Sequence, residues 1–231
     1  MSEEKHETKE KLLDAAESLF ACKGFEDVSI RELATEANVN VAAVNYHFQG
    51  KENLFHQVIM RRFVLQRDRT LEALETVLGS SEEKPGIAPV IHTLVEEYLK
   101  GTLSTPGGGS FMMLLAREMH SPHSHSSSAF FKEMVMPVFR AYSTALMDVR
   151  PCLKQDQINW VMASIIGQIH HFVARWHKKT TFEEQSEEVQ IMIKVFPALG
   201  QPVEQYIEMV TDHITAFSTA AIDSLYPEVP A

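Results

Sequence analysis

The chain has 231 residues, of which 45% are hydrophobic, and its formal net charge is −10. This length can bury a substantial core, in one large domain or in a small domain joined to a larger one. The acidic balance argues against a protein that binds polyanions without sequence preference, because such proteins normally carry a basic face. Cys22 and Cys152 form no metal-binding or disulfide pattern, and no apolar run approaches membrane-spanning length. We therefore expect a reduced, cytoplasmic protein.

The N-terminal segment predicts one helix that follows a short tail. Residues 1–7 are expected to fray, and Thr8 is expected to cap a helix that ends at Lys23-Gly24. The apolar positions of this segment recur at helical spacing, at Leu12, Leu13, Ala16, Leu19 and Phe20. This stripe should cover the two short helices that come next.

Residues 29–51 have the pattern of a helix-turn-helix. The spacing of five apolar residues indicates two short helices closed on one small core, formed by Leu33, Ala34, Val39, Val44 and Phe48. Local chemistry supports the helix ends: Ser29 with Glu32 suits a capping box, Asn38 tolerates left-handed geometry, and Asn40 can cap the second helix.

The second short helix presents a polar face. If Val44 and Phe48 point inward, Ala42 and Tyr46 point outward, with Ala43 and Asn45 beside them. Small residues next to an amide and a phenol suit a close approach to a DNA groove.

The order of residues from Thr8 to Lys51 resembles the tetracycline-repressor (TetR) family of bacterial transcription factors. The resemblance rests on KEKLLDAAESLFACKGF, Val28-Ser29, IRELATEANV and VAAVNYHFQGKENLF, and most specifically on Tyr46-His47-Phe48 followed by Gly50-Lys51-Glu52. It implies that double-stranded operator DNA is contacted by Ser29, Arg31, Val41, Ala42, Ala43, Asn45, Tyr46 and Lys51.

The resemblance also implies a division of roles among these residues. Tyr46 and Lys51 are expected to anchor phosphates, whereas Asn45 and Arg31 are expected to read bases. Tyr46 could instead be partly core, and Arg31 could be merely solvated. Because Val41 and Asn45 stand where many relatives have a polar residue and Tyr, the operator sequence cannot be carried over from them.

The rest of the chain reads as helices, which predicts an all-α fold. One long helix should run from Lys51 to about Gly79, before the break GSSEEKPG. Six further helices are expected at about 88–103, 109–120, 126–149, 155–178, 186–198 and 202–224, and Pro137 should kink or split its helix. We expect a DNA-binding domain over residues 1–51 and a helical ligand-binding and dimerisation domain over 52–231.

Two long helices carry apolar stripes. The stripe in 155–178 is Ile158, Val161, Met162, Ile165, Ile169, Phe172 and Trp176, and the stripe in 202–224 is Tyr206, Ile207, Val210, Ile214, Phe217 and Ala221. Ala163 and Gly167 lie one turn apart and would allow close helix approach. The stripes could build a four-helix bundle between two chains or simply fill one chain's core. The family resemblance implies a homodimer through these helices.

Short motifs in the C-terminal part resemble a narrower group. REMHSP at 117–122, Met136-Pro137 and ASIIGQ at 163–168 are similar to segments of the CerR or CecR (YbiH-like) subgroup of TetR regulators.

A Met- and Phe-rich region suggests a small-molecule site. Thioethers and aromatic rings can line an adaptable apolar cavity, although ordinary core packing explains each residue equally well. The candidate ligand-binding residues are Phe111, Met112, Met113, Arg117, Phe130, Met134, His170 and His171. His120, His123 and His125 invite a metal hypothesis, but they lack clustered cysteines or carboxylates, so we expect neither a metal site nor a cofactor.

Two alternatives stay open beside a regulator. An enzyme is not indicated, because the chain has no phosphate loop, nucleophile elbow or H-E-x-x-H motif. An interaction or scaffold protein that has lost DNA binding is compatible with the acidic N-terminal region. The expected function is a homodimeric transcriptional repressor that a small, largely apolar or aromatic ligand releases from its operator.

Overall fold

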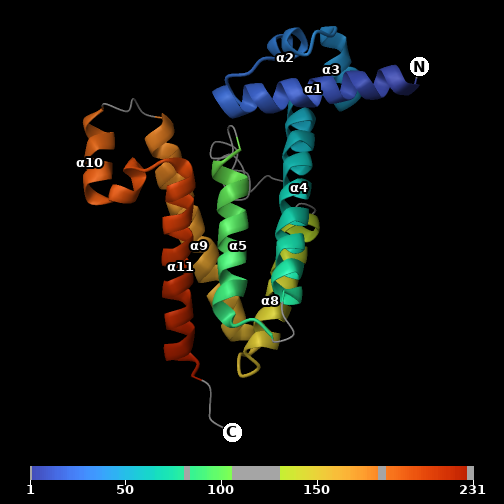
Figure 1. Ribbon diagram of the computed structural model, residues 1–231. Coiled ribbons are helices and arrows are strands. Elements are labelled where there is room, and N and C mark those ends of the chain that lie inside the picture. The colour runs from blue at the N-terminus through green and yellow to red at the C-terminus, as the bar shows by residue number, and fades with distance from the viewer. Residues whose placement is uncertain (1, 81–83, 106–130, 182–185, 228–231) are drawn as a thin grey trace. The chain divides into compact units, whose positions relative to one another are not determined.

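A computed structural model describes residues 2–80, 84–105, 131–181 and 186–227 (Figure 1). Every regular element in these ranges is a helix, which confirms the all-α class. The chain divides into two compact units, and the boundary lies inside α4 (Lys51–Gly79), between Leu65 and Gln66. This boundary comes later than the one expected at residue 51. The first half of α4 belongs to the N-terminal unit because the Phe55 ring packs there against Phe20, at a centroid distance of 5.2 Å.

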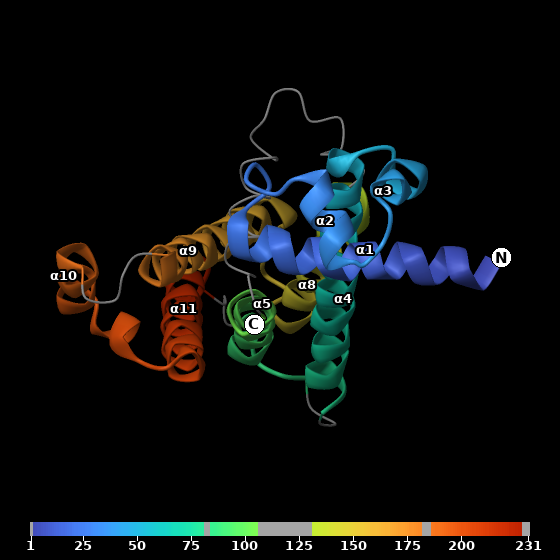
Figure 2. The ribbon, with the colours of Figure 1, turned by 90° about the horizontal axis from the view of Figure 1, so that it is seen from above.

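The N-terminal unit contains α1 (Ser2–Lys23), α2 (Ile30–Glu36) and α3 (Val41–Phe48). The expected frayed tail is wrong, since α1 begins at Ser2 and not at Thr8. Glu and Lys are good helix formers, and Glu7 pairs with Lys11 one turn later at 2.7 Å. Helix α1 consequently extends past α3 towards the N-terminus, as both views show (Figures 1 and 2).

The helix-turn-helix closes as its sequence predicts. Ser29 Oγ accepts a hydrogen bond from the Glu32 N–H at 3.2 Å, and Asn40 Oδ1 accepts one from the Ala42 N–H at 2.8 Å. Asn38 adopts the left-handed conformation, with φ of 52°. The small core is buried at Leu33, Ala34, Val44 and Phe48. Local capping and burial therefore fix the direction of α3.

An ion cluster fastens α1 to the first half of α4. Arg61 donates to Asp14 at 2.7 Å and to Glu17 at 2.6 Å, and it also pairs with Glu10 at 3.4 Å. Arg62 Nε donates to the other oxygen of Glu17 at 2.8 Å. Burial opposes ionisation of Glu17, but the hydrogen bonds from the two guanidinium groups hold the pKa of Glu17 below its usual value.

The C-terminal unit is built from α5 (Ile87–Leu103), α8 (Met136–Val149), α9 (Gln155–Thr181) and α11 (Val203–Leu225). Helices α5, α9 and α11 pack against one another, and α8 packs against α5 and α9 (Figure 1). The π-helical turn η1 (Phe131–Val135) precedes α8. Helix α10 (Glu187–Val195) and the 3₁₀ turn η2 (Pro197–Gly200) follow α9 and precede α11 in the sequence.

Prolines account for the two helices that are shorter than expected. Helix α8 begins at Met136, next to Pro137, and α10 stops before Pro197, because proline lacks the backbone donor that an uninterrupted helix needs. Pro137 was expected to kink or split its helix, and within residues 131–149 the helix changes from π to α at Met136, directly before this proline. The expected helix 109–120 and the start of the expected helix 126–149 lie outside the described residues.

The predicted apolar stripes fill the core of the C-terminal unit itself. The buried members are Ile158, Met162, Ile165 and Ile169 of α9 and Tyr206, Ile207, Val210 and Ile214 of α11. Phe217 departs from the prediction, because 58% of it is exposed. Ala163 and Gly167 lie on the exposed face of α9 together with Trp160, which is 73% exposed. Any contact between two copies through α9 would therefore use this second face and not the buried stripe.

Candidate nucleic-acid interface

Helix α3 presents the face that its sequence predicts. Val44 and Phe48 are buried, whereas Val41, Ala42 and Asn45 are exposed. Tyr46 is 64% exposed, which excludes a role as a core side chain. Ala43 is partly buried beside them. The result is a helix face with small apolar groups, one amide and one phenol, and such a face can approach a groove and hydrogen-bond to its edges or its phosphates.

The start of α2 contributes two further candidates. Arg31 is exposed, and its backbone carbonyl accepts a hydrogen bond from Thr35 Oγ1 at 2.9 Å. Ser29 is exposed as well, but its hydroxyl oxygen already accepts the capping hydrogen bond from Glu32. Lys23 forms a salt bridge with Glu32. The guanidinium of Arg31 is therefore the main cationic group that α2 offers.

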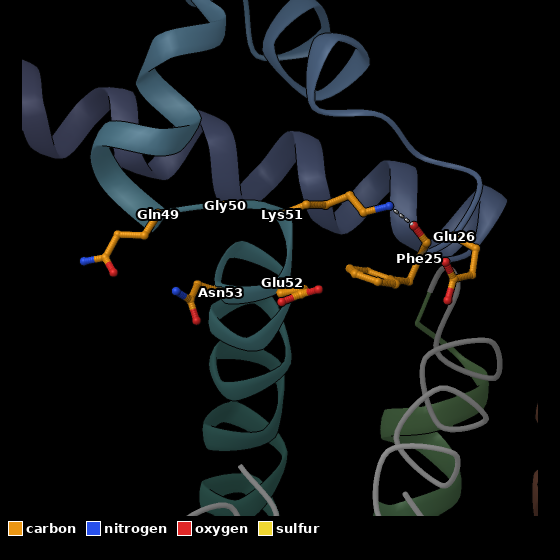
Figure 3. A pocket seen from close by; sticks show the side chains of 7 residues that line it. All are labelled: Phe25, Glu26, Gln49, Gly50, Lys51, Glu52 and Asn53. Carbon is orange, nitrogen blue, oxygen red and sulfur yellow. Dashed lines mark hydrogen bonds between the residues drawn. The ribbon is translucent and has the colours of Figure 1, made fainter. Parts of the chain in front are cut away.

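Lys51 is held inside the unit. Its ammonium donates to the carbonyl oxygens of Phe25 and Val28, at 2.8 and 2.9 Å. It also lies 4.2 Å from the centroid of the Phe25 ring, which attracts a cation electrostatically. Figure 3 shows the side chain reaching away from α3 towards the loop before α2. This geometry does not support the expected phosphate contact of Lys51 and gives it a structural role.

The hollow around Lys51 lies at the junction of α3 and α4 (Figure 3). Gln49 and Gly50 form the turn between these helices, with φ of 61° and 139°. The Gly50 conformation is one that side-chain-bearing residues rarely adopt, which explains the glycine before Lys51. The lining residues are Phe25, Glu26, Gln49, Gly50, Lys51, Glu52 and Asn53. With two carboxylates and one engaged ammonium, the hollow does not suit an anion.

The predicted ligand-binding residues are only partly within the described residues. Phe111, Met112, Met113, Arg117 and Phe130 lie outside them, and Met134 lies in η1 but its side chain is outside them too. His170 Nε2 is 2.8 Å from the hydroxyl of Tyr98, and burial raises the pKa of that hydroxyl. His171 Nε2 accepts from Arg175 Nε at 2.7 Å. The contact between Tyr98 and His170 was not predicted, because the two residues lie on different helices, α5 and α9.

The described ranges hold neither a group of potential metal ligands nor a candidate membrane-spanning helix. Within those ranges no three potential ligands among His, Cys, Asp and Glu come together. The expectation for His120, His123 and His125 falls on positions outside them. No helix in the described residues combines the length and the hydropathy that crossing a bilayer requires.

Two family models match the chain. The model of bacterial regulatory proteins of the tetR family matches residues 12–58, which include the whole helix-turn-helix. The model of the tetracyclin repressor-like C-terminal domain matches residues 92–194. Among individual proteins, the "Probable HTH-type transcriptional regulator YttP" of Bacillus subtilis is 31% identical over 88 residues, which are 38% of this chain and 42% of YttP. The chain matches less than half the length of each of the four leading relatives.

Solved structures agree in fold along nearly the whole chain. The "putative TetR-family transcriptional regulator" of Mesorhizobium loti has a TM-score of 0.64 at 14% identity, and the match covers 94% of this chain and 97% of that one. AibR, solved with isovaleryl coenzyme A and operator DNA, has a TM-score of 0.60 at 13% identity, with coverages of 96% and 100%. At these identities the likeness shows the fold. Because the two family models together match more than half of its residues, the chain belongs to the tetR family of bacterial regulatory proteins.

Proposed function

We propose that the chain is a sequence-specific DNA-binding transcriptional regulator, and that it acts as a homodimeric repressor in the cytoplasm. The exposed face of α3 is the observation that carries the proposal. It presents Asn45 and Tyr46 on a helix whose opposite face is packed into the core through Val44 and Phe48. Ser29, Arg31, Val41, Ala42 and Ala43 complete the proposed interface. Asn45 and Arg31 would read base edges, and Tyr46 would contact a phosphate.

Footprinting on the DNA that flanks the protein's own gene tests this proposal. The wild type should protect a discrete site, and Asn45→Ala should relax the preference at one base position of each half-site, by about 1–3 kcal/mol. Tyr46→Ala should weaken binding to all sequences alike. Equal loss of base preference from both substitutions would contradict the division of roles.

A dimer would bring two copies of α3 to successive turns of the DNA. Recognition helices must lie about 34–36 Å apart to enter successive major grooves on one face of the duplex. Exposed apolar side chains on α9 and α11, namely Trp160, Met209 and Phe217, would contact the second copy. The small residues Ala163 and Gly167 would allow close approach.

We further propose that a small, largely apolar or aromatic molecule releases the repressor from DNA. In the C-terminal unit α4 is held at three consecutive points: Gln66 donates to the Glu97 carbonyl at 2.7 Å, Arg67 to the Glu133 carbonyl at 3.1 Å, and Tyr142 to the Thr70 carbonyl at 3.2 Å. The same helix continues into the N-terminal unit. A ligand that shifts η1 or α5 would therefore bias the position of α4.

The ligand must prefer one geometry of the dimer, and each tenfold difference in affinity supplies about 1.4 kcal/mol of bias. Candidate compounds should be titrated against a preformed protein–DNA complex, while their binding to the protein is measured separately. Chemically diverse molecules that saturate the C-terminal unit and leave DNA affinity unchanged would contradict the mechanism.

The segments at 117–122 and 163–168 support assignment to the CerR or CecR (YbiH-like) subgroup, within the same proposal.

A further inference from the structure

The N-terminal unit has few cations available for phosphates. Residues 1–65 contain eight Lys and Arg against eleven Asp and Glu. Five of these cations are engaged within the unit: Lys11 by Glu7, Lys23 by Glu32, Lys51 by two carbonyls, and Arg61 and Arg62 by acidic residues of α1. Among the described residues, the other three, Lys5, Lys9 and Arg31, have no carboxylate within ion-pair distance.

Lys5 and Lys9 both lie beside α3. The Lys5 ammonium is 5.3 Å from the centroid of the Tyr46 ring, and the Lys9 ammonium is 6.0 Å from the centroid of the Phe48 ring. The two lysines are four residues apart, so they share one face of α1. Tyr46 is the residue of α3 that is proposed to contact a phosphate. The Lys5 ammonium is therefore placed next to the proposed DNA-contacting face, and Lys9 follows it one turn later on the same face of α1.

The acidic residues of α1 do not share this face. At 100° per residue, Glu10, Asp14 and Glu17 lie roughly 80–180° around the helix from Lys5 and Lys9. They face α4, where Arg61 and Arg62 neutralise them at 2.6–3.4 Å. Phosphates that approach the lysine face would consequently meet two cations and little opposing charge from the middle of α1.

We propose that Lys5 and Lys9 form a second phosphate-binding edge of the DNA interface, supplied by α1 and adjoining the α3 face at Tyr46. The partner is the sugar-phosphate backbone of the DNA that flanks the bases under α3, so these lysines add affinity and no base preference. The inference rests on the proposed function. It also assigns to α1 the phosphate contact that the engaged Lys51 is badly placed to make.

The test compares salt dependence on one defined probe. A duplex of about 30 base pairs is first selected by the wild type from a random library, and its affinity is measured against salt concentration for the wild type, Lys5→Gln/Lys9→Gln and the control Lys11→Gln. Each phosphate contact contributes about 0.9 to the slope of log affinity against log salt. The double variant should flatten that slope by about 1–2 and leave the order of preference among mismatched duplexes unchanged, whereas Lys11→Gln should keep the wild-type slope.

A slope unchanged in the double variant overturns the inference while the proposed function stands. If the wild type selects no sequence from the library, the proposed function fails, and the inference fails with it. Lys5→Arg/Lys9→Arg guards against a general disturbance of α1, because it retains both charges and should retain the wild-type slope. Loss of slope in this variant as well would also overturn the inference.

Discussion

At the scale of single residues, Lys51 shows how tertiary structure reassigns a side chain. The sequence motif places a lysine at the start of α4. Its ammonium donates hydrogen bonds to the carbonyl oxygens of Phe25 and Val28, which lie 26 and 23 residues earlier. Each hydrogen bond gives a donor to one backbone carbonyl of the loop between α1 and α2. Lys51 therefore ties this loop to the first turn of α4.

We predict that Lys51→Met destabilises the N-terminal unit by about 1–3 kcal/mol, because two carbonyls lose a charged donor and remain partly buried. Urea unfolding followed by circular dichroism measures this change. The matched control is Lys11→Met, which removes only an exposed salt bridge and should change stability by less than about 0.5 kcal/mol. A fully stable Lys51→Met protein whose DNA binding has lost about one unit of salt slope would restore the phosphate role expected from the sequence.

Residue-level predictions succeeded where neighbours along the chain decide the outcome. The caps at Ser29 and Asn40, the left-handed Asn38 and the exposure of Tyr46 all follow from spacing within a few residues. The carbonyl partners of Lys51 and the pairing of Tyr98 with His170 join segments far apart in sequence. No local pattern encodes such a contact, so the sequence alone could not have given it.

At the scale of elements, α4 and α5 meet through one small residue. The Gln66 side chain of α4 lies over Gly101 of α5, and a Cβ at position 101 would stand 1.4 Å from Gln66 Oε1. The Gln66 amide donates to the Glu97 carbonyl at 2.7 Å and to Thr70 Oγ1 at 3.2 Å. The glycine thus makes room for a polar contact between two helices.

Gly101→Ala should displace the Gln66 side chain and lower the free energy of unfolding of the C-terminal unit by about 1–3 kcal/mol. Adding Gln66→Ala should cost little more, because the displaced contact is already lost. A double-mutant cycle measured by denaturant unfolding checks this non-additivity. Additive losses from the two substitutions would show that Gln66 and Gly101 do not share one interaction.

The ion cluster between α1 and α4 predicts a pH dependence. Burial acts against ionisation of Glu17, but the hydrogen bonds from Arg61 and Arg62 dominate and lower its pKa in the folded state below the ordinary value of 4.5. A depressed carboxyl pKa stabilises the fold above the unfolded pKa, and this stabilisation is lost as pH falls through the folded pKa.

Glu17→Gln should therefore be less stable than the wild type at pH 7, by about 1 kcal/mol because the cluster is partly solvated. Since glutamine does not titrate, the difference in stability between the wild type and Glu17→Gln should narrow as pH falls below about 4.5. Thermal unfolding of both proteins between pH 3 and pH 7 measures the gap. A gap that stays constant or widens in acid would remove Glu17 as the titrating group.

At the scale of the whole molecule, periodicity predicts helices well, but it does not tell whether an apolar stripe packs inside one chain or against a second copy. The stripes of α9 and α11 were compatible with a dimer interface or a monomer core, and the structure assigns Ile165 and Ile214 to the core. The exposed Trp160 was not predicted, because an apolar side chain on a mostly polar face leaves little periodic signal, whereas Phe217 was assigned to the apolar stripe and is exposed. The helix limit near Pro137 was predicted because the missing backbone donor of proline was considered there. The same argument was not applied to Pro197, so the helix before it was expected to be longer than it is.

Gly167→Leu tests the proposed homodimer. A Cβ at this position meets no atom within 4 Å in the chain, so a leucine can be accommodated by a single copy. If a second copy packs on this face of α9, the leucine should push it away at a cost of about 1–3 kcal/mol per site. Sedimentation should show a dimer for the wild type and for the exposed control Glu75→Leu, and weaker association for Gly167→Leu. A monomeric wild type at micromolar concentration would rule the dimer out.

Selection from a random duplex library tests most directly whether α3 reads a defined DNA sequence as part of a symmetric dimer. The wild type is incubated with the library, and bound duplexes are amplified and sequenced over several rounds. We predict enrichment of an inverted repeat whose half-site centres are about 10–10.5 base pairs, or a multiple of that distance, apart, and no such enrichment with Asn45→Ala/Tyr46→Ala. A wild-type pool that remains random, or an enriched site that the α3 variant selects equally well, would contradict sequence reading by α3.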